Sequence, residues 1–166
     1  MTTTLHLLDP DATRALGAAI AGLLRAGDLV ILTGDLGAGK TTLTQGLGAA
    51  LGVRGQVASP TFVIAREHPS LVGGPALVHV DAYRLGNLRE IDALDLDSSL
   101  EESVTVVEWG AGLAERLSGD RLEVRIGRAR GDAADAGRDV EIVGVGPRWD
   151  GVDLAHLALD EREGRA

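Results

Sequence analysis

Residues 29–42 read Leu-Val-Ile-Leu-Thr-Gly-Asp-Leu-Gly-Ala-Gly-Lys-Thr-Thr, and this stretch decides the fold of the chain. It begins with a continuous apolar run, which is typical of a strand buried on both faces. A glycine-rich loop follows directly. Beyond the loop, apolar residues recur at the spacing of one helix face until Gly52, namely Leu43, Leu47, Ala50 and Leu51. A strand, a glycine-rich loop and a helix in this order are the setting in which Gly-x4-Gly-Lys-Thr binds phosphate.

The loop has a chemical task at most of its positions. Its glycines permit backbone conformations that turn successive N–H groups toward phosphate oxygens, and the N-terminus of the following helix adds a positive dipole end. Lys40 is expected to reach the β- and γ-phosphates, and the Thr41 hydroxyl is expected to ligate Mg²⁺. We therefore predict that the whole loop binds Mg-ATP, through Gly34, Asp35, Leu36, Gly37, Ala38, Gly39, Lys40, Thr41 and Thr42.

The amino-acid composition singles out Lys40. The 166-residue chain has 16 basic residues, of which 15 are arginine and one is this lysine. A phosphate-binding loop needs a compact ammonium rather than the planar fork of a guanidinium. We expect Lys40 to be exposed when no nucleotide is bound, and to serve both binding and catalysis. The single lysine also excludes the Asn-Lys-x-Asp motif that usually selects guanine, so a GTPase is disfavoured.

Two acidic residues end apolar runs elsewhere in the chain. Asp81 follows the apolar segment 76–80, and Glu108 follows the segment 104–107. If both segments are strands, both carboxylates lie at the carboxyl edge of the sheet, where ligands bind in open α/β folds. A P-loop site needs such a carboxylate to hold Mg²⁺ or its waters. We predict that both acids are catalytic residues and Mg²⁺ ligands, although the residues alone leave open which one contacts the metal.

Residues near these segments receive different interpretations. Thr61 lies in Ser-Pro-Thr-Phe at 59–62, where the switch segments of many NTPases supply a hydroxyl that senses the γ-phosphate. A proline-stabilised turn explains the same residues equally well. We include Thr61 among the catalytic candidates. His79 is interpreted as a satisfied polar residue without a catalytic role, and the aromatic residues, among them Trp109, as packing at the sheet edge.

The order of the expected elements predicts an α/β fold of the P-loop NTPase kind. Strands and helices alternate along the chain, which favours a mainly parallel sheet flanked by helices. Alternating apolar residues over 122–126, and again from Val140, predict an antiparallel hairpin late in the chain. The length fits a single domain at 1–160, with a frayed charged tail at 161–166.

Charge and composition restrict the partners and the compartment. The chain is 45% hydrophobic and 25% charged, and it contains no cysteine, which excludes a disulfide framework and a thiolate metal site. Neither a signal peptide nor an apolar run long enough to span a bilayer is present, so we predict a cytoplasmic protein without membrane contact. The net charge of −9 argues against a direct grip on nucleic acid. Any role near RNA should therefore run through a partner.

Four blocks together resemble the TsaE family, the small bacterial ATPases of tRNA threonylcarbamoyladenosine biosynthesis. They are Gly-Asp-Leu-Gly-Ala-Gly-Lys-Thr-Thr at 34–42, Ser-Pro-Thr-Phe at 59–62, His-Val-Asp-Ala-Tyr-Arg at 79–84 and Val-Glu-Trp at 107–109. Their order and spacing match over about residues 5 to 126. After Ser-Pro-Thr-Phe the family usually has a tyrosine behind an acidic residue, whereas here Glu67 is followed by His68, and the segment after Arg128 carries no motif of the family.

The resemblance implies a partner as well as an activity. It implies an ATPase that acts with a threonylcarbamoyl-transferring synthase and its paralogous partner (TsaD- and TsaB-like), and that meets tRNA only indirectly. It places Thr41 and Glu108 at the Mg²⁺, makes Asp81 the Walker-B-like acid, and puts Thr61 in a nucleotide-sensing loop.

Two other classes of function remain open on the sequence. A small-molecule kinase would need an arginine-bearing lid, for which Arg66, Arg84 and Arg89 are candidates. A nucleotide-dependent assembly factor would bind ATP and hardly turn it over. No arginine is obviously placed as a finger within the chain, although Arg66 and Arg84 are near enough in the sequence to leave that open. We expect slow hydrolysis by the isolated protein and acceleration by partners.

Overall fold

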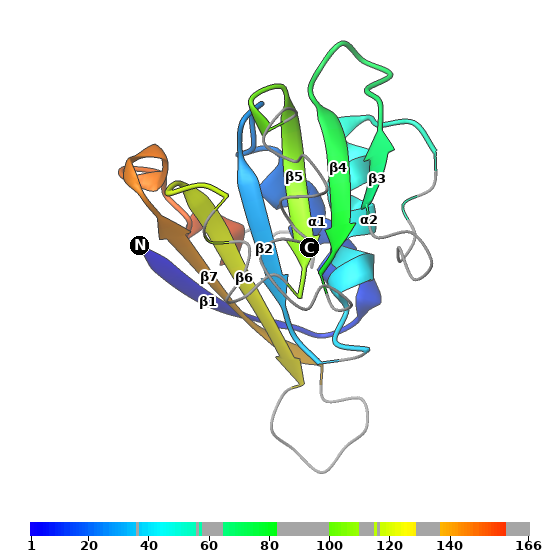
Figure 1. The fold of residues 1–166 in the computed structure, drawn as a ribbon. Coiled ribbons are helices and arrows are strands. Elements are labelled where there is room, and N and C mark those ends of the chain that lie inside the picture. The colour runs from blue at the N-terminus through cyan, green and yellow to red at the C-terminus, as the bar shows by residue number, and fades with distance from the viewer. Residues whose placement is uncertain are drawn as a thin grey trace.

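The computed structural model describes residues 1–35, 37–55, 57, 65–82, 100–109, 115, 117–128 and 137–158. Two α-helices, one 3-10 helix and seven strands are defined within this part of the chain, and Figure 1 shows their arrangement. In chain order the elements are β1 (Thr2–Leu7), α1 (Pro10–Ala21), β2 (Leu29–Thr33), α2 (Lys40–Leu51), β3 (Ala65–His68), β4 (Ala76–Asp81), β5 (Ser103–Glu108), β6 (Arg121–Arg128), β7 (Arg138–Val145) and the short 3-10 helix η2 (Pro147–Trp149). The domain limits 1–160 remain a prediction, and the expected tail at 161–166 lies outside the described residues.

All seven strands form one mixed sheet in the order β1-β7-β6-β2-β5-β4-β3. The middle of the sheet is parallel, because β2 pairs in parallel with β5 and β6, and β4 pairs in parallel with β5. Both margins are antiparallel, through the pairs β1–β7, β6–β7 and β3–β4. The predicted α/β class and the late antiparallel hairpin, β6–β7, are therefore found.

The expectation of a mainly parallel sheet is wrong, since only three of the six neighbouring pairs are parallel. The reason is the way the chain closes both edges. On one side the β6–β7 hairpin brings β7 against the N-terminal strand β1, and on the other the short connection from β3 to β4 makes a second hairpin. Short connections of this kind join antiparallel strands, whereas parallel neighbours need a longer crossover.

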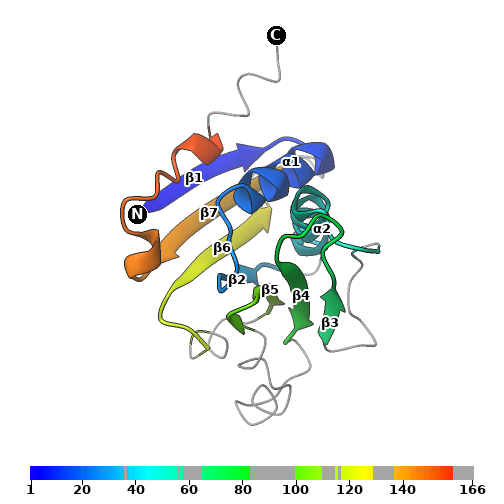
Figure 2. The ribbon, with the colours of Figure 1, turned by 90° about the horizontal axis from the view of Figure 1, so that it is seen from above.

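The two helices pack side by side on the same face of the sheet (Figure 2). α1 begins where the Asp9 carboxylate accepts a hydrogen bond from the Ala12 N–H at 2.8 Å, with Pro10 in the first turn. α2 ends at Gly52, whose φ of 71° supplies the left-handed cap. The helices approach closely at Gly46, where an added Cβ would lie 2.0 Å from the Arg14 carbonyl oxygen. This packing fixes the direction of α2, and with it the position of the loop that precedes the helix.

Apolar side chains bury both faces of the central strands. One cluster joins the helices to the sheet and includes Leu16, Leu43, Leu47, Val30 and Leu32. The alternate residues of β2 form a second cluster on the opposite face with residues of β4 and β5 and with the residue that follows β4. This cluster consists of Leu29, Ile31, Val78, Val80, Ala82 and Val107. The continuous apolar run of β2 is explained by this double burial.

An ion pair attaches the C-terminal part of the described chain to the start of β2. The Arg148 guanidinium, in η2, donates to both carboxylate oxygens of Asp28, at 3.0 and 2.9 Å, and to the Leu23 carbonyl oxygen at 2.8 Å. Asp28 is only 5% exposed. This buried two-point contact lies away from the glycine-rich loop and serves the fold.

Candidate nucleotide-binding site

The glycine-rich loop connects β2 to α2 and folds over its own lysine. Gly37 and Gly39 have φ angles of 75° and 110°, which a residue with a side chain rarely adopts. The Lys40 ammonium donates to the carbonyl oxygens of Gly34 and Asp35, at 2.5 and 3.0 Å. The loop therefore encloses the Lys40 ammonium with its own carbonyl groups.

The expectation that Lys40 is exposed without nucleotide is wrong, because the residue is only 6% exposed. Its ammonium donates hydrogen bonds to two carbonyl groups of the loop. The Trp109 ring covers the ammonium, with 4.0 Å between the ring centroid and Nζ, which is the geometry of a cation–π contact. Burial lowers the pKa of Lys40 from its usual 10.5, and the negative charges of Glu108, Asp81 and Asp35 act in the opposite direction. The loop carbonyl groups and the Trp109 ring therefore enclose the ammonium, which does not extend into solvent.

The two strand-end acids lie side by side opposite the loop. Asp81 ends β4 and Glu108 ends β5, and the two residues are register partners in the parallel pair. The Thr41 hydroxyl, in the first turn of α2, donates to Glu108 Oε1 at 3.4 Å. The sequence placed both acids at the carboxyl edge of the sheet, and the structure brings that edge to the N-terminus of α2. Their chemical roles remain predictions.

His79 lies directly behind Glu108. Its Nε2–H donates to Glu108 Oε2 at 2.5 Å, and the two side chains are 0% and 5% exposed. His79 is indeed a bonded polar residue, as the sequence suggested, but its partner is the site carboxylate. The sequence offered one signal for this position. Residues two apart on a strand point to the same face, so His79 shares a face of β4 with the strand-end residue Asp81. Within the described part of the chain, His79 Nδ1 has no hydrogen-bond partner.

Trp109 is the second residue whose place the sequence interpretation missed. It follows Glu108 directly and has a φ of 61°, and it is the single non-glycine residue with positive φ among those described. Its backbone N–H donates to the Leu32 carbonyl oxygen at 3.0 Å, and this hydrogen bond connects the end of β5 to the end of β2. Such backbone conformations are uncommon outside glycine and often occur at functional sites. Here the conformation accompanies the contact of the indole ring with Lys40.

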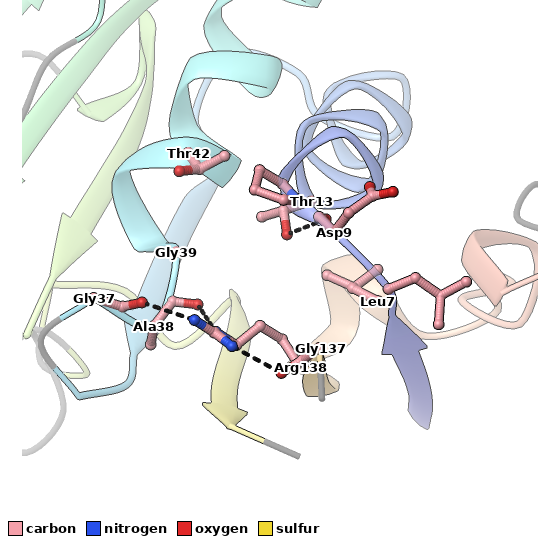
Figure 3. A pocket seen from close by; sticks show the side chains of 11 residues that line it. Leu7, Asp9, Thr13, Gly37, Ala38, Gly39, Thr42, Gly137 and Arg138 are labelled. Carbon is pink, nitrogen blue, oxygen red and sulfur yellow. Dashed lines mark hydrogen bonds between the residues drawn. The ribbon is translucent and has the colours of Figure 1, made fainter. Parts of the chain in front are cut away.

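A cavity of about 340 Å³ opens beside the loop, between the start of α1 and the start of β7 (Figure 3). Thr42, Thr13 and Arg138 are among its lining residues, together with the backbone of Gly37 to Gly39. Arg138 points to the loop and donates to its carbonyl groups in Figure 3. No motif in the sequence indicated Arg138.

The oxygen atoms of Thr41 and Glu108 are suitable ligands for a hard cation. A hydroxyl and a carboxylate are oxygen ligands of the kind that Mg²⁺ takes, and Mg²⁺ usually completes its shell with waters and substrate phosphates. In the part of the chain that the structure describes, no group of three or more His, Cys, Asp or Glu residues is arranged to hold a metal ion. Of the predicted site residues, Leu36 and Thr61 lie outside the described residues.

Comparisons with known proteins agree with one another. The sequence model of one family, described as threonylcarbamoyl adenosine biosynthesis protein TsaE, matches residues 7–137. The chain is 64% identical over 146 residues to the tRNA threonylcarbamoyladenosine biosynthesis protein TsaE of Streptomyces coelicolor, which covers 87% of this chain and 99% of that protein. The protein of the same name from Bacillus subtilis is 37% identical over 144 residues, covering 86% of both.

A solved structure shares the whole fold. The crystal structure of YdiB from Bacillus subtilis matches with a TM-score of 0.71 and 29% sequence identity, covering 100% of this chain and 97% of that one. Among the described residues, no helix is long and apolar enough to cross a membrane.

Proposed function

The chain belongs to the TsaE family, as the four sequence blocks suggested, and on this premise we propose that it is the Mg-dependent ATPase subunit required for threonylcarbamoyladenosine modification of tRNA. The observation that carries the ATPase assignment is the meeting of the loop with the strand-end acids. Lys40 and Thr41 begin α2, and Asp81 and Glu108 end neighbouring strands. The Thr41 hydroxyl donates to Glu108, and the charges of both carboxylates act on the Lys40 ammonium.

The loop provides the binding step. Phosphate oxygens would accept hydrogen bonds from the loop N–H groups and lie at the positive end of the α2 dipole. The Lys40 ammonium would exchange the carbonyl oxygens of Gly34 and Asp35 for phosphate oxygens. Because burial has already removed most of the water from Lys40, its attraction to a phosphate is stronger than that of an exposed lysine.

The acids provide the chemical step. Thr41 and Glu108 are the residues that would hold Mg²⁺, which supplies neutralising charge at the phosphoryl group that is transferred. Asp81 lies next to Glu108 and would hold a water molecule, while the hydrogen bond from His79 would keep the Glu108 carboxylate in one orientation. Thr61, which the resemblance puts in a nucleotide-sensing loop, completes the proposed set.

The nucleoside part of ATP would occupy the cavity beside the loop. Thr42 lines this cavity (Figure 3) and follows Lys40 and Thr41 along α2. A chain of phosphates that starts at Lys40 would therefore lead toward the cavity. A volume of about 340 Å³ lies within the range of small-molecule sites.

The proposed partners follow from the family and from the charge. With a net charge of −9, the subunit is poorly suited to bind tRNA unaided. We place it with the threonylcarbamoyl-transferring synthase and its paralogous partner, the TsaD- and TsaB-like proteins that the resemblance names. Hydrolysis would then reset the complex between modification cycles. NTPases that rely on a partner to complete the site gain about 10³- to 10⁵-fold in turnover.

The test is the steady-state ATPase rate of the purified chain, measured alone and then with both partner proteins. We expect slow turnover alone, dependence on Mg²⁺ and a large increase on addition of the partners. Rapid turnover that the partners leave unchanged would contradict the proposed role and favour a free-standing ATPase. Transfer of phosphate to a metabolite would favour a kinase, and tight ATP binding with no hydrolysis under any condition would favour an assembly factor.

A further inference from the structure

Arg138 reaches the phosphate-binding loop from a strand that carries none of the site motifs. Its side chain donates from Nε to the Ala38 carbonyl oxygen at 3.1 Å, from Nη2 to the Gly37 carbonyl oxygen at 3.3 Å, and from Nη1 to the Gly137 carbonyl oxygen at 2.8 Å (Figure 3). The residue lies one position beyond the segment 7–137 that matches the family. We propose that Arg138 is a positioning residue that braces the loop in its phosphate-binding shape, an inference that rests on the proposed function.

The brace has a rigid base. Arg138 is the first residue of β7, and β7 lies between two strands. Its register partners are Leu7 on β1 and Arg128 on β6. Pairing with the strands on both sides fixes the backbone from which the Arg138 side chain extends. Two of its N–H groups then donate to consecutive carbonyl groups of the loop. A lysine at this position would carry one nitrogen in place of the three of the guanidinium, so it would not place separate donors on the Gly37, Ala38 and Gly137 carbonyl groups.

The contact holds the side of the loop that faces away from the phosphates. A trans peptide points its C=O and its N–H in opposite directions. By holding the Ala38 carbonyl, Arg138 therefore fixes the direction of the Gly39 N–H on the opposite side of the same peptide. The preceding peptide is held at both ends, because its Gly37 carbonyl accepts from Arg138 and its Ala38 N–H donates to the Asp35 carbonyl oxygen at 3.0 Å.

Such a brace would raise affinity by preorganisation. Gly37 and Gly39 give the free loop many accessible conformations, and these are lost when the N–H groups converge on a phosphate. A contact that fixes the loop beforehand removes part of that loss from the binding step. Hydrogen bonds from a charged donor are stronger than neutral ones, and a guanidinium at the carbonyl end also polarises the peptide so that its N–H becomes a better donor.

The test compares Arg138→Ala and Arg138→Lys with a matched control, Arg125→Ala. Arg125 lies on the neighbouring strand β6, is 57% exposed, and pairs with Glu123 and Glu141 instead of the loop. Each variant is titrated with Mg-ADP and with Mg-pyrophosphate, which keeps the two phosphates and lacks the nucleoside. Hydrogen exchange of the amides at 37–40 is measured in the nucleotide-free protein, and thermal unfolding checks the fold.

A brace predicts the same loss for both probes. For Arg138→Ala we expect about tenfold weaker binding of ADP and of pyrophosphate, which corresponds to about 1.4 kcal/mol, and faster exchange of the loop amides. Arg138→Lys should be intermediate and Arg125→Ala should equal the wild type. ATP turnover at saturating nucleotide should change by less than about threefold, because the loop still adopts its shape once the phosphates are bound.

Three results would overturn the brace. Weaker binding of ADP with unchanged binding of pyrophosphate would show that Arg138 contacts the nucleoside directly. Equal affinities in Arg138→Ala and Arg125→Ala would show that the contact does not matter for binding, and unchanged exchange at 37–40 would show that it does not order the loop. If the wild-type chain binds neither probe, the proposed function fails instead, and the exchange measurement still decides whether Arg138 holds the loop.

Discussion

Replacing His79 by alanine should damage both stability and catalysis, for two separable reasons. The imidazole is 0% exposed and donates to a carboxylate that is 5% exposed. Removal of the ring leaves Glu108 Oε2 buried without this donor and opens a cavity in the sheet. Loss of one partner from a buried charged contact costs about 3 kcal/mol, so the free energy of unfolding should fall by about that amount.

On the proposed function, a catalytic effect is expected because Glu108 would lose its fixed orientation. Partners behind a metal-binding side chain typically contribute 10- to 100-fold to activity, and we expect a loss of about this size in the turnover number. The affinity for ADP should change much less, since Lys40 and the loop N–H groups remain in place. His79→Gln should recover much of the turnover, because its amide nitrogen can occupy the position of the imidazole Nε2 and donate to Glu108.

His68 supplies the matched control for this experiment. It is another buried histidine, 4% exposed, on the neighbouring strand β3, and one ring nitrogen bonds to the Arg54 carbonyl oxygen at 3.0 Å. His68→Ala should therefore lower stability without lowering the turnover number. The assays are chemical denaturation and single-turnover ATP hydrolysis at saturating nucleotide. Full turnover in His79→Ala, or an equal loss of turnover in His68→Ala, would refute the positioning argument.

Three further predictions address the loop, the acids and the fold. Lys40→Ala should weaken Mg-ATP binding by about 30-fold to several thousand-fold and leave the circular dichroism spectrum unchanged. This range corresponds to the about 2–5 kcal/mol that truncating one partner of a buried charge contact costs. An unaltered ATP affinity in calorimetry would contradict the assignment of the loop as a nucleotide site. Glu108→Ala and Thr61→Ala should each lose far more hydrolysis than nucleotide affinity, because their proposed contacts strengthen in the transition state, and a fully active Glu108→Ala protein would contradict the role of that acid. Asp28→Ala leaves the Arg148 guanidinium buried without its carboxylate and should lower the free energy of unfolding by about 3 kcal/mol, while ADP affinity measured at a temperature where the variant is folded stays at the wild-type value.

The sequence could place the acids but not the residues that support them. Asp81 and Glu108 were recognisable because each ends an apolar run, and strand ends share an edge in a sheet of parallel neighbours. The contact between His79 and Glu108 depends on β4 and β5 being adjacent, which no local pattern states. The exposure of Lys40 was misjudged for a similar reason, since the carbonyl groups and the Trp109 ring that enclose it come from the folded loop and from the end of β5.

The sequence by itself determined the strand and the helix that flank the glycine-rich loop, and the family. These features are local, because a strand, a glycine-rich turn and a helix are specified by the pattern of their own residues. Only the tertiary structure decided the strand order, the antiparallel margins and the approach of Arg138, which contacts Ala38 from 100 residues away. Pairing between distant strands depends on the burial of whole faces rather than on any one segment, so a short motif cannot specify which strand will lie behind it.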